Sequence, residues 1–164
     1  MSTENKIKLL IVDDEIEFLK AVSSRLELQG FDVTTASNGK EAIVAAENGF
    51  FDVAIVDVDM PGIAGAQLLK ILKDRHNYLE IIILTGHATI DSAVESTKMG
   101  AFKYLEKPYA FEKLVEAIKE AYEARLQRKF AHNTKRNQEI QNLLIGSSPL
   151  GILKKLASLD DEEK

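Results

Sequence analysis

The residues best suited to chemistry in this sequence are acidic side chains that follow short apolar runs. Asp13 and Asp14 come directly after the run Ile7–Val12, and Asp57 comes directly after the run Val53–Val56. Clustered carboxylates repel one another, so each raises the pKa of its neighbours or recruits a cation. Oxygen ligands without histidine or cysteine suit Mg²⁺, and a carboxylate beside Mg²⁺ can attack phosphorus to form an aspartyl phosphate.

A hydroxyl group follows a third apolar run, and an ammonium group follows a weaker candidate strand. Thr85 comes directly after Ile81–Leu84, and Lys107 lies two residues after Phe102–Leu105. Phosphoryl transfer requires neutralisation of the charge that develops on the equatorial oxygens, and Mg²⁺, a lysine and a hydroxyl can provide it. Together with the carboxylates, these residue types predict a site for phosphoryl chemistry.

These residues require a scaffold that brings five separate strand ends together. Apolar runs without polar alternation are typical of strands covered on both faces, and two weaker strands fit Asp32–Thr35 and Phe102–Leu105. Helical spacing and end signals fill the intervals. The helices are expected from Ile16 to just before Gly30, from the Asn38–Glu41 capping pair to just before Gly49, over Ala66–Asp74, over Ile90–Met99, and from Phe111 onward.

The alternation of strand and helix predicts an α/β fold. Five parallel strands with right-handed crossovers form an open, doubly wound sheet with helices on both faces. Such sheets place their reactive groups beyond the carboxyl ends of the strands. We therefore expect the acidic residues, Thr85 and Lys107 to meet at one edge of the sheet.

The composition changes near Ala124, after which residues 127–139 are strongly polar. We expect the fifth helix to continue into this stretch as an amphipathic extension. One face of it would carry Phe111, Leu114, Val115, Ile118, Tyr122 and Leu126. Residues 127–164 are predicted to be a helical linker and a frayed tail, with no second folded domain.

Charge and composition exclude several classes of function. Of 164 residues, 45% are hydrophobic and 29% charged, as in an ordinary globular protein. The net charge of -5 argues against direct nucleic-acid binding, and the lack of cysteine excludes disulfides and thiolate chemistry. No apolar run approaches the roughly 20 residues of a membrane helix, and no signal peptide is evident. We expect a cytoplasmic protein with no membrane contact.

Four motifs in order resemble the receiver domain of two-component response regulators. They are IVDDE, VDVDMPG, ILTGHA and YLEKP, and the resemblance covers about residues 5–126. The stretch TGHATIDSAVESTKMGAFKYLEKP is also similar to receivers of sigma-54-dependent activators. The resemblance implies a flavodoxin-like sheet with strand order 2-1-3-4-5, followed here by an extended C-terminal helix.

The resemblance implies a role for each of the acidic residues. Asp57 would be the phosphoacceptor, and it would share Mg²⁺ with Asp13, Asp14 and the backbone carbonyl of Asp59. The side chain of Asp59 is left open between a plain loop residue and one that steers water and so tunes the phosphoryl lifetime.

Three more residues have implied roles in switching. Thr85 would be the switch hydroxyl that binds the phosphoryl group, and Lys107 would be its counter-ion. Tyr104 matches the aromatic residue that changes rotamer on activation. The bond between Lys107 and Pro108 is expected to be cis, as is typical of the family.

The implied function is a switch with stoichiometric phosphorylation and dephosphorylation, not a turnover enzyme. A sensor histidine kinase or phosphotransfer protein would be the donor, and the output would be contact with an unknown protein. A homodimer through the fourth and fifth helices is a further expectation. Two alternatives stay open: a phosphohydrolase of the haloacid dehalogenase type, suggested by Asp57-Val58-Asp59, and a binding or dimerisation module that is never phosphorylated.

Overall fold

The computed structural model describes residues 5–59, 65–86, 98, 100–144 and 157 of the chain. The chain divides into two units, Met1–Arg125 and Leu126–Lys164. Helix α5, Phe111–Leu144, crosses this boundary and so contributes residues to both units. The first unit contains the sheet and every residue with a predicted chemical role.

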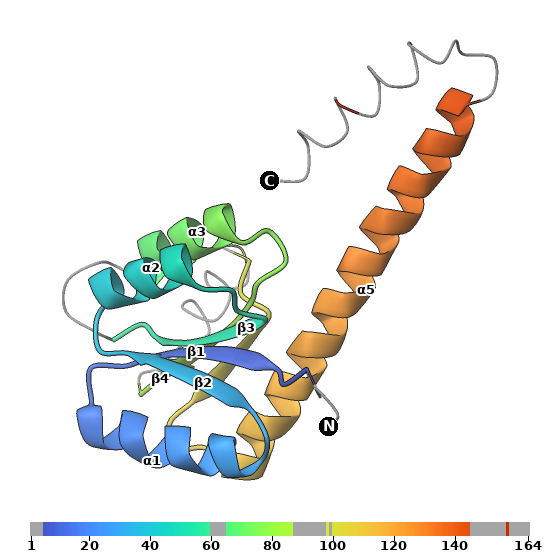
Figure 1. Cartoon of the computed structure of the whole chain (residues 1–164). Coiled ribbons are helices and arrows are strands. Elements are labelled where there is room, and N and C mark those ends of the chain that lie inside the picture. Colours follow the sequence, from blue (N-terminus) through green and yellow to red (C-terminus); the bar gives the residue numbers. More distant parts are fainter. Residues whose placement is uncertain (1–4, 60–64, 87–97, 99, 145–156, 158–164) are drawn as a thin grey trace. The chain divides into compact units, whose positions relative to one another are not determined.

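The first unit is built on one five-stranded sheet in which all neighbouring strands are parallel. Its order is β2-β1-β3-β4-β5, as the resemblance to receiver domains implied (Figure 1). The strands are β1 (Lys8–Val12), β2 (Asp32–Ala36), β3 (Val53–Asp57), β4 (Glu80–Thr85) and β5 (Lys103–Glu106). The predicted doubly wound, flavodoxin-like α/β fold is confirmed.

Helices connect the strands and cover both faces of the sheet (Figure 1). They are α1 (Ile16–Leu28), α2 (Gly39–Asn48), α3 (Gly65–Arg75) and the first part of α5. The helix predicted over Ile90–Met99 lies outside the described residues. The extended C-terminal helix is present and runs without interruption to Leu144.

Alternate residues of the central strands supply two separate cores, which explains why these strands have no polar alternation. Leu9 and Ile11 of β1 face one way and pack with α1 and α5, whereas Leu10 and Val12 face the other way and pack with α2 and α3. Nearly all of these side chains are fully buried. The central strands β3 and β4 are buried along their whole length, whereas the edge strands β2 and β5 are largely exposed or half-buried.

Local signals at two helix ends behave as the sequence predicts. Gly30 has φ +94° just past the end of α1, a left-handed conformation that glycine adopts without steric cost. The Asn38 side chain accepts a hydrogen bond from the Glu41 amide (2.9 Å) and caps α2. The Glu41 carboxylate accepts hydrogen bonds from the amide and the hydroxyl of Ser37, one residue earlier than in a standard capping box.

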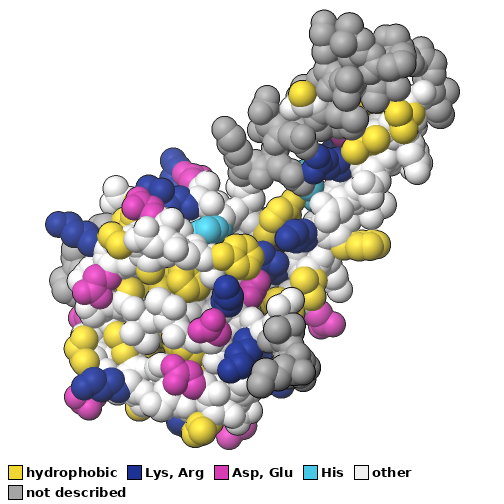
Figure 2. All heavy atoms as spheres, viewed as in Figure 1, with side chains coloured by type: hydrophobic (Ala, Val, Ile, Leu, Met, Phe, Trp, Pro, Cys, Tyr) yellow, Lys and Arg dark blue, Asp and Glu magenta, His cyan; other side chains and the backbone are white. Residues whose placement is uncertain are grey.

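The second unit is helical as far as it is described, because α5 continues through residues 126–144. Leu126, Phe130 and Leu144 are large apolar side chains exposed on this part of the helix. Within the described residues, no helix combines the length and apolar character needed to cross a membrane. Acidic and basic side chains are interspersed over the visible face of the first unit and do not gather by sign (Figure 2).

Candidate metal and phosphoacceptor site

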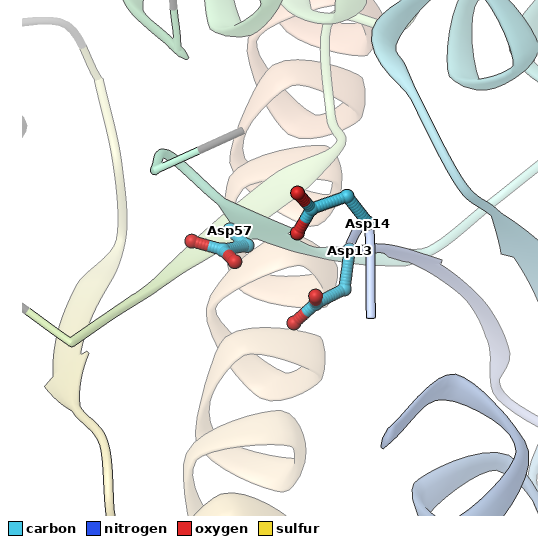
Figure 3. Close-up of side chains that lie close together, drawn as sticks. All are labelled: Asp13, Asp14 and Asp57. Carbon is cyan, nitrogen blue, oxygen red and sulfur yellow. The ribbon is translucent and has the colours of Figure 1, made fainter. Parts of the chain in front are cut away.

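Three carboxylates meet at the carboxyl edge of the sheet. Asp13, Asp14 and Asp57 each offer an oxygen within 4.8 Å of the others, and Figure 3 shows their side chains side by side. Asp13 and Asp57 are buried, with 1% and 5% of their surface exposed, whereas Asp14 is open to solvent. The site therefore has two buried carboxylates and one that solvent can reach.

The register of the sheet explains this convergence. Val12 at the end of β1 pairs with Val56 of β3, so the next residues, Asp13 and Asp57, leave adjacent strands at the same level. The Asp13 amide donates to the carbonyl of Ala36 (3.1 Å), which extends the pairing of β1 with β2 by one residue. Two-sided burial of the strands thus fixes where both carboxylates emerge.

Lys107 provides the positive charge that faces these carboxylates. Its Nζ lies 2.7 Å from Asp13 Oδ2 and 3.5 Å from Asp57 Oδ2. Its amide donates to the Thr85 carbonyl (2.7 Å), which anchors the end of β5 to β4. The peptide bond to Pro108 is cis, as expected.

The pKa of Asp57 is raised above its ordinary value. Burial is the main cause, and the negative charges of Asp13 and Asp59 add to it, while the hydrogen bond from the Asp59 amide and the charge of Lys107 act in the opposite direction. For Lys107, burial lowers the pKa, but the hydrogen bond and charge of Asp13 and the charge of Asp57 outweigh this and raise it. The lysine therefore stays protonated beside the acidic group.

Thr85 lies at the end of β4 and is buried, with 1% of its surface exposed. Its hydroxyl donates to Asp59 Oδ2 (2.7 Å), and the Gly86 amide donates to the same oxygen (3.0 Å). Asp59 itself follows β3, and its amide donates to Asp57 Oδ1 (2.9 Å). Thr85 is thus connected to the acidic cluster through the side chain of Asp59.

Tyr104 lies on β5, opposite Ile83 of β4. It is half-buried and packs against the core on the α2–α3 side of the sheet. Its role in switching stays a prediction.

Two features of the site escaped the sequence reasoning. Phe18 of α1 lies with its ring 4.4 Å from Lys107 Nζ, and this ring also packs edge to face against Tyr109. A cation over an aromatic face is attracted by the ring quadrupole, so Phe18 helps to hold the lysine. The second feature is the contact of the Asp59 side chain with Thr85 and Gly86. Neither is marked by a motif.

The donor set of the cluster fits a hard divalent cation. All three candidate ligands are carboxylate oxygens, and Mg²⁺ prefers oxygen ligands while keeping several waters. The raised pKa of Asp57 also fits, because a bound cation would stabilise the charged form that burial, and to a lesser extent the neighbouring carboxylates, disfavour. The arrangement can bind a metal beside a carboxylate that is backed by a lysine.

Comparison with known proteins agrees with this fold. The family model described as response regulator receiver domain matches residues 9–119, which is more than half of the chain. The chain therefore belongs to the receiver domains of two-component response regulators. Members of this family act as signalling switches.

Individual relatives support the same assignment. The DNA-binding transcriptional regulator NtrC of Salmonella typhimurium is 37% identical over 111 residues, which cover 68% of this chain and 24% of the relative. A CheY-like receiver domain from Methanospirillum hungatei has a TM-score of 0.72 at 31% identity and covers 76% of this chain and 99% of that one. The beryllofluoride-activated NtrC4 receiver domain dimer has a TM-score of 0.68 at 35% identity, covering 72% and 98%.

The chain spans about a quarter of the length of the curated relatives that it matches. The part that they share with this chain is the receiver domain. The similarity to NtrC confirms the predicted resemblance to receivers of sigma-54-dependent activators.

Proposed function

We propose that this chain accepts a phosphoryl group on Asp57 from the phosphohistidine of a sensor kinase or phosphotransfer protein. The observation that carries the proposal is the convergence of Asp57 with Asp13, Asp14 and Lys107 at one edge of the sheet. In the proposal the receiver occupies residues 5–126, residues 127–164 form a linker and tail, and the protein works in the cytoplasm.

The proposed step is a direct displacement at phosphorus. A carboxylate oxygen of Asp57 forms a bond to phosphorus as the bond from phosphorus to the imidazole nitrogen breaks, and the imidazole leaves. Lys107, 3.5 Å from Asp57 Oδ2, neutralises charge on the transferred group. Bound Mg²⁺, held by Asp13, Asp14, Asp57 and the Asp59 carbonyl, would neutralise the remaining phosphoryl charge.

The product would act as a switch and not as a turnover enzyme. The phosphoryl group adds nearly two negative charges, and Thr85 and Lys107 would bind its oxygens. Shifting a conformational population from 1:99 to 99:1 requires about 5.5 kcal/mol of differential binding. Charge-assisted hydrogen bonds contribute about 1.5–3 kcal/mol each, so about two at the upper end of this range, or about four at its lower end, would supply this difference. Tyr104 would change rotamer, and the altered surface near β5 and α5 would bind an output protein.

Intact-mass measurement tests this proposal. Incubation with acetyl phosphate and Mg²⁺ should add one phosphoryl group to the wild-type protein and none to Asp57→Asn. No increment in the wild type, or an equal increment in the variant, would exclude the mechanism. Continuous turnover of a chromogenic phosphate ester would instead favour the phosphohydrolase alternative, although Asp57 lies on the third strand and that class has its nucleophile on the first.

The metal proposal is tested by thermal unfolding. A ligand that binds only the folded state at 100 times its dissociation constant stabilises by about 2.7 kcal/mol. Saturating Mg²⁺ should therefore raise the Tm of the wild type, and Asp14→Asn, which removes an exposed ligand, should weaken this response. An equal rise in both proteins would argue against the proposed ligand set.

A homodimer through the fourth and fifth helices is part of the proposal. The solved NtrC4 receiver domain dimer in its beryllofluoride-activated form supports it. Leu114 and Ile118 of α5 are buried in the chain's own core, so they are not available to a second copy, whereas Leu126 is exposed. Sedimentation with and without beryllofluoride is the test, and an unchanged monomer in both conditions would exclude the dimer.

A further inference from the structure

The end of β4 presents two donors to a single oxygen atom. The Thr85 hydroxyl and the Gly86 amide both donate to Asp59 Oδ2, at 2.7 and 3.0 Å. Hydrogen bonds to an ionised acceptor are shorter and stronger than neutral ones. Two donors that converge on one carboxylate oxygen form a binding site for an anionic oxygen, called here the Thr85–Gly86 oxyanion seat. In this structure the side chain of Asp59 occupies it.

The seat lies next to the proposed phosphoacceptor. Asp59 is two residues from Asp57 along the chain, and its amide donates to Asp57 Oδ1 (2.9 Å). Leu84, the residue before Thr85, pairs directly with Asp57 in the sheet. A phosphoryl oxygen on Asp57 that took up the Thr85 hydroxyl would therefore meet a carboxylate already bound to this donor.

We propose that Asp59 is a positioning residue that occupies the Thr85–Gly86 oxyanion seat in the unphosphorylated protein and must be displaced by the phosphoryl group. This inference rests on the proposed phosphorylation of Asp57. The two anions compete for the same donors and also repel each other, so the carboxylate opposes premature movement of Thr85. Asp59 thereby sets the equilibrium between the unphosphorylated and phosphorylated arrangements, in addition to any contribution of its backbone carbonyl to metal binding.

Graded substitutions separate competition from simple charge repulsion. Asp59→Ala removes the competing acceptor, whereas Asp59→Asn removes the charge but keeps an acceptor oxygen, and both keep the backbone carbonyl. The probe is beryllofluoride at saturating Mg²⁺. Competition predicts that the dissociation constant decreases in the order wild type, Asn, Ala, by roughly tenfold overall, since charge-assisted hydrogen bonds are lost from the free state. An equal decrease in the dissociation constant for Asp59→Asn and Asp59→Ala would show that Asp59 acts only through its charge, and it would overturn the proposal.

Glu106→Gln is the matched control for charge. Glu106 is an exposed carboxylate that pairs with Thr85 across the β4–β5 register. Its neutralisation should change the beryllofluoride affinity by less than twofold. An effect as large as that of Asp59→Ala would contradict the proposal, because it would show that any neighbouring negative charge suffices.

The free protein provides a readout that does not depend on phosphorylation. The Gly86 amide should shift upfield and exchange faster with solvent in Asp59→Ala, because it loses its acceptor. An unchanged Gly86 amide would overturn the proposal even if the affinity changed. Failure of the wild type to bind beryllofluoride would instead contradict the proposed function, so the two failures are distinguishable.

Discussion

At the scale of single residues, the site depends on a balance between burial and charge around Asp57. Burial raises the pKa of this carboxyl, and Lys107 and the Asp59 amide limit the rise. Carboxylates that are buried beside one another destabilise a fold unless a cation compensates them. The ionised carboxylates of the site should therefore lower the free energy of unfolding of the metal-free protein, and the size of this loss should depend on pH.

The stability of Asp57→Asn tests the sign of this cost. Because the folded protein binds the Asp57 proton more tightly than the unfolded chain does, the free energy of unfolding falls as pH rises from the ordinary pKa of 3.8 through the raised value. Asparagine carries no charge and escapes this loss. In EDTA, the variant should be more stable than the wild type at neutral pH, and the advantage should disappear below the ordinary pKa.

Urea unfolding across this pH range is the measurement. A variant that is less stable than the wild type at neutral pH, or a difference that does not vary with pH, would contradict the direction of the shift.

The counter-ion role of Lys107 makes a second prediction. Lys107→Met would leave Asp13, which is almost fully buried, without its 2.7 Å partner, and breaking such a pair is expected to lower the free energy of unfolding by about 2 kcal/mol. The matched control is Lys103→Met, which removes an exposed pair with Glu120 and should cost less than about 0.5 kcal/mol. Equal losses in urea unfolding would show that Lys107 behaves as a surface lysine.

At the scale of elements, most of the fold could be predicted because burial on two faces leaves a clear pattern. The apolar runs Val53–Val56 and Ile81–Leu84 are the centres of β3 and β4, which extend by one polar residue at one end or both. The weaker edge strand was predicted from Phe102 to Leu105, but β5 runs from Lys103 to Glu106, one residue later. Phe102 is partly exposed and lies just before β5, although its amide already donates a hydrogen bond to the Ile81 carbonyl of β4.

The same rule predicted the convergence of the carboxylates but not their finer contacts. Asp13 follows β1 and Asp57 ends the adjacent strand β3, and strand register decides where they lie. The contact of Phe18 with Lys107 depends on how α1 packs against the start of α5, and the bond between Asp59 and Thr85 depends on a rotamer in a loop. Sequence periodicity determines neither of these.

The end of α1 offers a prediction about an element. Gly30 has φ +94°, which strains any residue with a Cβ, although no atom lies within 4 Å of the position that a Cβ would take. Gly30→Ala should therefore destabilise the protein by about 1 kcal/mol through backbone strain alone. Gly49→Ala is the control, because Gly49 has a φ of -145° and ordinary contacts. Thermal unfolding should separate the two, and an equal loss would contradict the strain argument.

At the scale of the whole molecule, the family assignment and the site belong to the first unit. The family match covers residues 9–119, and all the residues proposed for phosphoryl chemistry lie within it. The second unit contributes the continuation of α5, with exposed apolar side chains at Phe130 and Leu144. Phosphorylation of Asp57 would therefore change the binding of other proteins at the surface of the first unit. The exposed apolar side chains of α5 offer a further surface for such binding.

The identity of the phosphorylated residue is the most direct test of the whole account. After reaction with acetyl phosphate and Mg²⁺, borohydride reduces an aspartyl phosphate to homoserine, which peptide mass spectrometry can locate. We predict homoserine at position 57 only, and its absence when EDTA replaces Mg²⁺. Homoserine at position 13, 14 or 59, or at none, would contradict the account.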